Sequence, residues 1–367
     1  MDYQWKGIYG QSRVLDTLEK FFSSDRISHA YLFHGPQGTG KHITALRFAE
    51  LINNKSGKDF SKKINALEEP YLKYIFPLPR GKSETPDDSP TVKLTPDQIK
   101  EINAQILKKS ENPYYNFQIE KATSIKINSI RNLKKFISLD YSDLNYRVII
   151  ISDAHLMNAE AQNALLKSLE EPPEGVVFIL LTPHPEQLLE TIRSRSWQMN
   201  FAPLKVEDVE QILKEYFKIN ETLARKAALF SNGSVSHAIE LLDNNFEELL
   251  EKTIFILRFA LVKRYNSALI AINDFSGDNS AKALKLIIQM IIKWLNDVMK
   301  DKVNYEKFYF IDFKDTMIKF NEKFPDADIE RLVEKLNELS ASIEKNVSLN
   351  LIALNIIFEI SSLQNRT

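Results

Sequence analysis

The eight residues that decide the fold are Gly35-Pro36-Gln37-Gly38-Thr39-Gly40-Lys41-His42. They follow a short apolar run at residues 30–33, which predicts a buried β-strand, and they open a helical pattern. This arrangement fits the phosphate-loop pattern G-x-x-x-x-G-K-[ST], whose glycines turn backbone N–H groups toward phosphates while the lysine reaches the outer phosphate oxygens. The final hydroxyl of the pattern binds Mg²⁺, but residue 42 is histidine, a poor ligand for this oxygen-seeking ion. The loop therefore predicts a phosphate cradle at Gly35, Gly38, Gly40 and Lys41 with impaired metal handling.

The composition is that of an ordinary globular protein. The chain has 367 residues, of which 44% are hydrophobic and 26% charged, and its formal net charge is −1. The lack of cysteine excludes disulfides, thiolate zinc sites and cysteine nucleophiles. The sequence contains no apolar run of the ~20 residues that a membrane helix needs, and its first residues lack the pattern of a signal peptide. We therefore expect a cytoplasmic protein without a membrane segment.

Strand-like apolar runs alternate with helical patterns through the first 200 residues, which predicts an α/β phosphate-loop domain with a parallel five-stranded sheet. The five predicted strands are residues 30–33, 115–119, 147–151, 176–181 and 197–201. Strand signals end after Pro203 and helical patterns take over. We expect an α/β domain over 1–202 with an irregular insertion at about 53–113, which contains one helix at about 97–110. A small three-helix lid follows over 203–245, and an all-helical domain over 246–367 begins with a helix at 246–273.

ATP hydrolysis also needs an acid pair at the end of a later strand. One carboxylate holds the Mg²⁺ shell and the next polarises the attacking water. The candidate positions are Ser152 and Asp153, which follow the predicted strand 147–151 and offer one carboxylate. The spacing alone leaves open which of the two roles Asp153 fills.

Three blocks in the same order resemble the clamp-loader AAA+ family, and most closely its delta-prime subunits of bacterial DNA polymerase III. The blocks are residues 28–36, 163–173 and 191–196. The resemblance covers about residues 5–202 well and the lid moderately. The last domain matches only in its helical character, where the family has a collar that holds the subunits together.

The resemblance implies which positions of an ATPase are lost. Ser152 falls where active loaders carry the Mg²⁺-associated aspartate, Asp153 where they carry the catalytic glutamate, and Ser236 where they carry the sensor-2 arginine. Together with His42 these mark four lost ATPase positions, while Thr182 stands at the sensor-1 position. The resemblance thus implies that no cofactor is required and leaves open ATP or ADP binding without hydrolysis. Many relatives bind zinc through four cysteines after the first helix, but residues 53–76 contain none, so we expect no zinc and no other metal.

Arg195 resembles the arginine finger that enters the ATP site of a neighbouring subunit. A guanidinium is always charged and can bridge developing phosphate charge. The alternatives are that Arg193 takes this role or that Arg195 is a surface arginine capping a strand end.

The resemblance favours a non-hydrolysing subunit of a hetero-oligomeric clamp loader within the DNA polymerase III assembly. The implied partners are gamma/tau ATPase subunits, a delta subunit, the sliding clamp, and primer–template DNA through the assembled complex. One alternative is a weakly active ATPase in its own right, using Lys41 and Asp153. Another is a DNA-binding AAA+ protein with no clamp role. Against it, six lysines are predicted to be scattered on solvent-exposed faces: Lys62, Lys63, Lys108, Lys109, Lys134 and Lys135.

Overall fold

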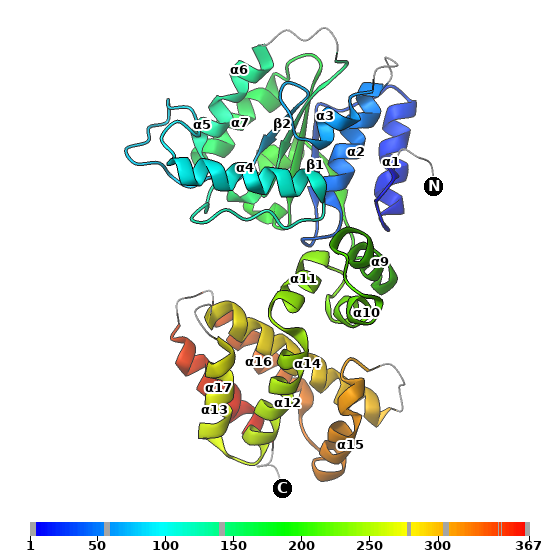
Figure 1. Ribbon diagram of the computed structural model, residues 1–367, viewed down its shortest axis with the longest axis vertical. Helices are drawn as coiled ribbons and strands as arrows, with labels where there is room; N and C mark the ends of the chain where they lie inside the picture. Colours follow the sequence, from blue (N-terminus) through cyan, green and yellow to red (C-terminus); the bar gives the residue numbers. More distant parts are fainter. Residues whose placement is uncertain are drawn as a thin grey trace. The chain divides into compact units, whose positions relative to one another are not determined.

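The computed structural model describes residues 5–54, 59–138, 144–276, 280–303, 308–343, 345 and 347–363. By its internal contacts the chain divides into two units, Met1–Ala238 and Ile239–Thr367, and each is described by itself. The labels of the elements are those of Figure 1. The predicted division into three domains stays a prediction.

Unit 1 is built around a five-stranded parallel sheet, which confirms the predicted α/β fold class. The strands are β1 (Ala30–His34), β2 (Leu72–Ile75), β3 (Arg147–Ile151), β4 (Val176–Thr182) and β5 (Trp197–Asn200). Their order across the sheet is β2-β3-β4-β1-β5, and all neighbouring pairs are parallel. Every residue of β4 is buried, as expected for a parallel sheet covered on both faces.

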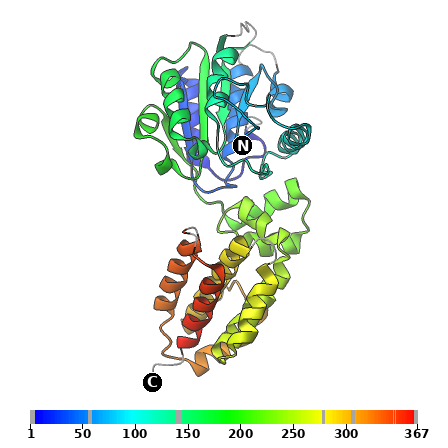
Figure 2. The same cartoon turned by 90° about the vertical axis from the view of Figure 1, so that its left-hand side faces the viewer.

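Helices cover both faces of this sheet (Figure 2). On one face lie α1 (Ser12–Ser23) and α2 (Lys41–Asn53), whose Phe21 and Phe48 rings lie 5.9 and 5.1 Å from the ring of Tyr31 in β1. The next residue, Leu32, points to the other face, because side chains alternate along a strand. There it joins a core formed with α5 (Ile127–Arg131), α6 (Leu133–Ser138), α7 (Ala159–Glu170) and α8 (Glu190–Ser194).

One of the five predicted strands was wrong. Residues 115–119 form no strand, and the missing partner of β3 is β2, which lies inside the segment predicted to be irregular. The apolar residues Phe117 and Ile119 instead pack on a side cluster of Phe76, Leu78, Leu94 and Ile102. Nearby backbone N–H groups, those of residues 118 and 120, donate to side chains of residues 105 and 101 rather than to a sheet. Period-two apolar spacing alone does not distinguish these two environments.

The insertion at 53–113 is therefore more regular than predicted. Besides β2 it contains a short helix that was not predicted, α3 (Ser61–Asn65). The predicted helix at about 97–110 is confirmed as α4 (Pro96–Glu111), which begins with a reciprocal capping box between Thr95 and Gln98. Glu84 forms a buried ion pair with Lys126, with Oε1 and Nζ 2.7 Å apart. These contacts, with the apolar cluster around Phe76 and Leu78, attach the insertion to the rest of unit 1.

A polar network joins the start of the insertion to α2. Glu50 of α2 pairs with Arg47 at 2.7 Å and accepts a hydrogen bond from Asn65 of α3 at 2.5 Å. The rings of Phe60 and Tyr71 pack beside it, 5.5 Å apart. Hydrogen bonds from Asn65 to Glu50 and from Arg47 to Asn65 thus join α3 to α2, and the ring pair joins the start of α3 to the turn before β2.

The three lid helices lie where the sequence places them: α9 (Val206–Phe217), α10 (Glu221–Phe230) and α11 (Val235–Asp243). Asn220 caps α10 by accepting the N–H of Leu223. The boundary between the two units falls within α11, after Ala238. The first residues of α11 therefore belong to unit 1, where they meet the phosphate loop.

Unit 2 is all-helical in the described residues. Its helices are α12 (Phe246–Leu261), α13 (Tyr265–Ser276), α14 (Ser280–Lys302), α15 (Lys314–Lys323), α16 (Ile329–Ile343) and α17 (Leu349–Ser362). The single helix predicted over 246–273 was wrong, because the chain turns between α12 and α13. Lys263 adopts a left-handed backbone, φ 59°, and the N–H of Arg264 donates to the carbonyl of Phe259. The residue in this conformation at a helix end is usually glycine. Because residue 263 is a lysine, the end of α12 could not be predicted from the sequence.

Candidate functional site

The sheet brings three separate segments to one edge. The phosphate loop follows β1, Ser152 and Asp153 follow β3, and Thr182 ends β4. These three strands are neighbours in the order β3-β4-β1 and run parallel, so their carboxyl ends meet at the same edge. This is where open parallel sheets hold ligands.

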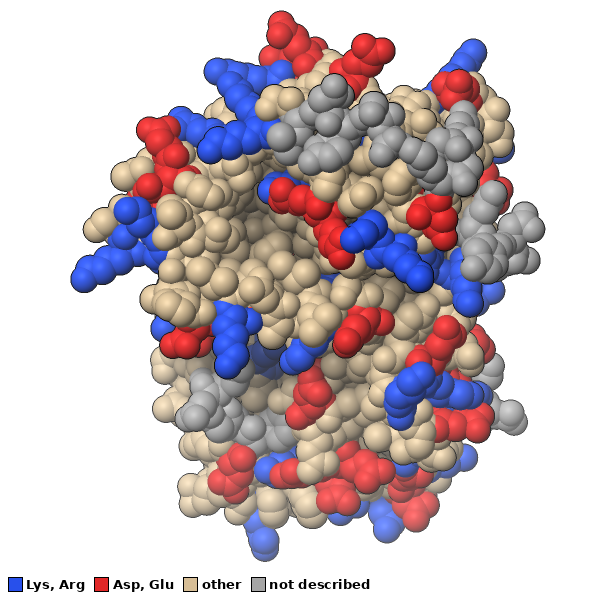
Figure 3. All heavy atoms as spheres, turned by 45° about the horizontal axis from the view of Figure 1, so that its top comes forward, with Lys and Arg blue, Asp and Glu red and all other residues tan. Residues whose placement is uncertain are grey.

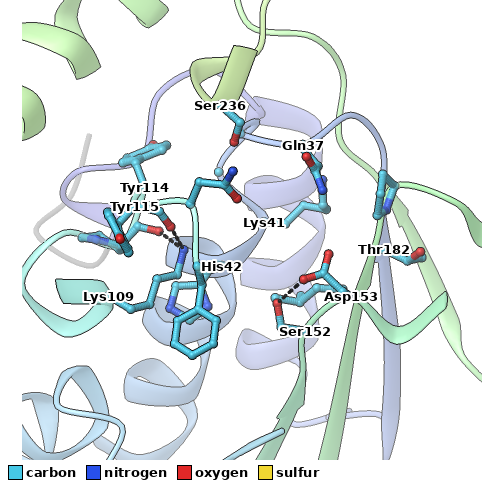
Figure 4. A pocket seen from close by; sticks show the side chains of 17 residues that line it. Gln37, Lys41, His42, Lys109, Tyr114, Tyr115, Ser152, Asp153, Thr182 and Ser236 are labelled. Atoms are coloured by element: carbon cyan, nitrogen blue, oxygen red, sulfur yellow. Dashed lines mark hydrogen bonds between the residues drawn. The ribbon is translucent and has the colours of Figure 1, made fainter. Parts of the chain in front are cut away.

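A pocket of about 90 Å³ lies at this edge. Eight of the predicted site residues line it: Gly38, Gly40, Lys41, His42, Ser152, Asp153, Thr182 and Ser236. Gly35 and Arg195 are not among its lining residues. Figure 4 shows the side chains of the lining residues converging from the loop, the two strand ends, the lid and the insertion.

Two glycines of the loop are needed for its close contacts. Gly35 has φ 134°, and a Cβ there would lie 2.1 Å from the carbonyl oxygen of Phe201. Gly38 has φ 67°, and a Cβ there would lie 2.3 Å from the backbone nitrogen of Ser236. Neither position accepts a side chain without movement of the backbone around it.

Lys41 is buried and donates to its own loop. Its Nζ lies 2.7 Å from the carbonyl oxygen of Gly35 and 2.5 Å from that of Pro36, and the residue is 8% exposed. Burial lowers the pKa of Lys41 to about 8, and the negative charge of Asp153 opposes this shift. An ammonium has three N–H donors, so two are used on the loop and one is left for the pocket.

His42, at the position of the missing hydroxyl, is neutral and buried. It is 8% exposed, and its ring lies 5.3 Å from that of Tyr74 in an edge-to-face arrangement. Neither ring nitrogen has a hydrogen-bond partner in the part of the chain that the structure describes. Burial lowers the pKa of His42 well below its usual value, and the nearby charge of Lys109 lowers it further.

Ser152 and Asp153 occupy the end of β3. Asp153 has a left-handed backbone, φ 51°, a conformation that aspartate tolerates. The hydroxyl of Ser152 donates to Oδ2 of Asp153 at 3.4 Å. Asp153 is the single carboxylate among the described residues that line the pocket.

The donor set does not fit Mg²⁺. This ion requires oxygen ligands in near-ideal octahedral geometry, and the pocket offers one carboxylate and a serine hydroxyl beside a neutral imidazole and two ammonium groups. Within the described ranges there is also no group of three or more His, Cys, Asp or Glu placed to hold a metal ion.

The lid meets the loop through the backbone. The N–H of Val235 donates to the carbonyl of Gly38 at 3.2 Å, and the hydroxyl of Ser234 donates to the carbonyl of Gln37 at 2.8 Å. Ser236 follows at the pocket wall and carries no charge. The lid thus contacts the phosphate loop through two hydrogen bonds. At residue 236, where an arginine could sense a ligand, it has a serine.

Thr182 lies in the pocket wall but its hydroxyl is already engaged. Its Oγ1 accepts the N–H of His184 at 2.9 Å and lies 3.2 Å from Nδ1 of His155. Its carbonyl accepts the N–H of Gly35 at 3.3 Å, which ties the end of β4 to the start of the phosphate loop.

Lys109 is the site residue that sequence reasoning missed. It was predicted to be solvent-exposed, and this was wrong: it is 7% exposed and reaches the pocket from α4. Its Nζ donates to the carbonyls of Pro113 and Tyr115 at 2.8 and 2.7 Å, and burial lowers its pKa to about 7. Ile102, Ile106 and Lys109 share one face of α4 at helical spacing, which was the available signal.

Arg195 lies at the opposite edge of the sheet. It ends α8 just before β5 begins, whereas the pocket lies where β1, β3 and β4 end. Its side chain is 38% exposed, with Nη2 3.1 Å from Oε1 of Glu170 and Nη1 3.3 Å from the carbonyl oxygen of Thr191. Arg193 is more buried, and its Nε lacks a hydrogen-bond partner among the described residues.

The other predicted basic residues form no continuous stripe. Lys62, Lys63, Lys108, Lys134 and Lys135 are exposed, as predicted. On the face of the molecule in Figure 3, lysine and arginine side chains are interspersed with aspartate and glutamate. Such mixed charge does not favour a sequence-independent nucleic-acid surface there.

Comparison with known proteins identifies the family. Residues 10–205 match the family described as "DNA polymerase III, delta subunit". The delta' subunit of Bacillus subtilis is 31% identical over 256 residues, which cover 69% of this chain and 66% of that protein. The tau subunit of the same organism is 27% identical over 250 residues, which cover 65% of this chain but 37% of tau.

A solved structure of a gamma subunit-related protein from Thermotoga maritima aligns with 95% of this chain and 99% of its own, at 16% identity and a TM-score of 0.46. None of the described helices is long and apolar enough to cross a membrane. The match over residues 10–205 spans more than half of the chain. The chain therefore belongs to the DNA polymerase III delta-subunit family of clamp-loader AAA+ proteins.

Proposed function

We propose that this chain is a non-hydrolysing, delta-prime-like subunit of the DNA polymerase III clamp loader. In this role it supplies Arg195 to the ATP site of a neighbouring gamma/tau subunit while the sliding clamp is loaded. A delta subunit, the clamp and primer–template DNA are its other partners. The observation that carries the proposal is the contrast between a pocket unsuited to Mg²⁺ and an exposed arginine outside that pocket.

The pocket supports the loss of hydrolysis. Phosphoryl transfer from ATP needs a metal that bridges the outer phosphates and a group that orients the attacking water. His42 and Ser152 stand where metal binding is expected, and Asp153 is one methylene shorter than the glutamate expected for the water. A misplacement near 1 Å can cost about 10²-fold in such sites. With the uncharged Ser236 at the fourth lost position, four defects at one pocket therefore act together against turnover.

The setting of Arg195 supports a role in another subunit. Its guanidinium is exposed, yet Glu170 and the carbonyl of Thr191 hold it in place. An arginine finger contributes roughly 10³–10⁵ in rate to the ATP or GTP site that it enters. Arg193 is less suited, because its side chain is partly buried against unit 1.

Reconstitution tests this role. The chain is combined with gamma/tau, delta, the clamp and primed DNA, and ATP hydrolysis and clamp loading are compared for wild type, Arg195→Ala and Arg193→Ala. We expect Arg195→Ala to slow clamp loading at least about tenfold, as loss of a finger at one site should. Arg193→Ala is the matched control and should change it less than about twofold. Unchanged hydrolysis and loading in Arg195→Ala would show the assignment to be wrong.

The purified chain alone tests the alternative of a weakly active ATPase, which the intact glycines and Lys41 favour. With Mg²⁺ and ATP we expect no turnover above background. Turnover that disappears in Lys41→Ala would establish the ATPase instead.

A further inference from the structure

The two outermost strands of the sheet differ in how they are covered. β2, at one end of the strand order, has two buried and two half-buried residues, and the insertion packs against it. β5, at the other end, exposes Trp197, Gln198 and Asn200 and buries Met199. An exposed outermost strand presents unpaired N–H and C=O groups and can therefore pair with another chain.

The direction of the backbone groups of β5 follows from its pairing with β1. Asn200 lies opposite His34, and the N–H of Phe201 donates to the carbonyl of His34 at 2.8 Å. Because the backbone groups of successive residues point to opposite sides of a strand, those of Gln198 and Asn200 point away from β1. Within the described ranges no partner takes up these groups. The outer side of β5 therefore has free backbone donors and acceptors.

Gln11 shows how an amide pairs with this outer side. Ala202 is the next residue whose backbone groups point outward, and its N–H donates to Oε1 of Gln11 at 3.1 Å. Its carbonyl accepts a hydrogen bond from Nε2 of Gln11 at 2.7 Å. This reciprocal pair has the donor and acceptor arrangement of peptide groups on neighbouring strands. The side chain of Gln11 thus fills one position of a ladder that is open at Gln198 and Asn200.

A groove with an aromatic side chain at its rim lies beside these free groups. Its volume is about 850 Å³, and the first turns of α1, β5 and the link to α9 line it. This volume falls within the range of roughly 300–1,000 Å³ that is usual for ligand sites. Trp197 is 51% exposed, yet its ring packs edge-to-face on Phe21 of α1 with 4.9 Å between centroids. An exposed tryptophan held in this way is the kind of residue that anchors a partner.

The charges of the groove favour an acidic partner. Arg13 and Lys205 line it and are exposed, and neither forms an ion pair with any residue that the structure describes. Asp208 is the single carboxylate among the described lining residues. Two cations facing one anion leave a net positive charge, which a carboxylate of the partner would complement.

We propose that the outer side of β5 takes up an extended segment of a partner protein as an added strand. One apolar side chain of that segment packs on Trp197, and one carboxylate faces Arg13 and Lys205. A nucleic acid could meet the two cations, but it would leave the backbone groups of Gln198 and Asn200 without the peptide partners that they fit. The proposal does not depend on the role assigned to Arg195.

The fluorescence of the full chain tests this surface with the acetylated and amidated peptide Thr-Val-Thr-Glu-Thr-Val. In an added strand its valines and glutamate share one face, because side chains alternate. Trp5 and Trp294 are 5% and 1% exposed, so quenching by acrylamide reports mainly on Trp197. We expect the peptide to protect Trp197 from quenching, saturating with a dissociation constant below about 1 mM. No protection at that concentration would overturn the proposal.

Backbone methylation of the peptide tests strand addition itself. Two further peptides carry N-methyl groups on alternate residues, one on the valines and glutamate and the other on the threonines. In an added strand one set of N–H groups faces β5 and the other faces away. One methylated peptide should therefore lose binding while the other keeps it. Equal binding of the two, at any level, would exclude an added strand.

A charge swap tests the acidic specificity, measured by the fluorescence anisotropy of dye-labelled peptide. Arg13→Glu should weaken binding of the glutamate peptide about fivefold, and a peptide with lysine in place of glutamate should recover it. Lys20→Glu is the matched control, because it makes the same charge change on an exposed residue of α1 that does not line the groove. Equal losses in the two variants would refute the role of Arg13. A single-stranded oligonucleotide that displaces the labelled peptide, where excess unlabelled peptide does not, would identify a nucleic-acid surface and overturn the proposal.

Discussion

The two edges of the sheet in unit 1 differ in how their charged groups are held. At the carboxyl edge, Lys41 and Lys109 are buried, bonded to backbone carbonyls and lowered in pKa. At the amino edge, Arg195 is exposed and paired with Glu170. At the carboxyl edge most of the lysine N–H groups are used on backbone carbonyls, while at the amino edge the guanidinium of Arg195 is exposed. Because the two edges share none of these contacts, we expect a substitution at one edge to leave the other unchanged.

The largest effect is expected from closing the space between the loop and the lid. Gly38→Ala places a Cβ 2.3 Å from the nitrogen of Ser236 at a φ of 67°, so we expect unit 1 to lose about 3 kcal/mol of unfolding free energy. The N–H of Val235 donates to the carbonyl of Gly38, so its hydrogen exchange should become faster in Gly38→Ala than in wild type. Gly175→Ala is the control, since φ there is 68° but the nearest atom lies 3.5 Å away, and it should cost about 1 kcal/mol. If both variants lose the same unfolding free energy, the lid and the loop are not in close contact at Gly38.

A smaller effect is expected in how the unfolding free energy changes with pH, which depends on Lys109 at the carboxyl edge. The pKa of Lys109 is lowered from 10.5 to about 7 by burial, so above pH ~7 the unfolded chain binds the proton that the folded chain has released. Stability therefore rises with pH over this window, by at most about 1.4 kcal/mol per pH unit for one lysine. Denaturant unfolding of wild type and Lys109→Gln between pH ~7 and ~9 measures it, and the rise should be reduced in the variant. Arg195→Ala should keep the full rise, because Arg195 lies at the opposite edge of the sheet from Lys109. A flat wild-type profile would contradict the burial of Lys109.

The smallest effect is expected at the amino edge. Glu170→Gln removes an exposed ion pair that contributes less than about 1 kcal/mol, so the melting temperature should scarcely change. If Glu170 orients Arg195, however, partner ATP hydrolysis in the reconstituted loader should fall by about two- to fivefold while the affinity for the partner is kept. Glu171→Gln serves as the neighbouring control. A fall in Glu171→Gln equal to that in Glu170→Gln would remove the positioning role.

Local patterns with a single physical meaning were readable from the sequence. The glycine-rich loop between β1 and α2 was one, because few other arrangements need glycines and a lysine at that spacing. Helix α7 was another, since Asn158 caps it and its buried residues Ala161, Leu165 and Leu169 recur at helical spacing. The loop motif predicts four residues of the pocket, Gly38, Gly40, Lys41 and His42, and the end of a predicted strand adds Ser152 and Asp153. Thr182 and Ser236 come from the resemblance to clamp loaders.

Features that depend on contacts between segments far apart in the sequence could not be predicted. The edge strand β2 has only four residues, and its identity comes from pairing with β3. Residues 115–119 have the stronger strand pattern but pack against α4 and the cluster around Phe76. Lys109 looked like an exposed charge because lysine is rarely buried, and only the fold of the insertion brings its ammonium to the carbonyls of Pro113 and Tyr115.

The contact between the lid and the phosphate loop bears on how motion passes through an assembly. A nucleotide moves a domain only if it binds two arrangements of that domain with different affinity. Here the N–H of Val235 and the hydroxyl of Ser234 join the lid to Gly38 and Gln37 without any bound group. These two hydrogen bonds favour one arrangement of the lid on the loop. In the proposed role, we expect the chain to keep that arrangement while a neighbouring subunit hydrolyses ATP, and so to act as the stationary member of the assembly.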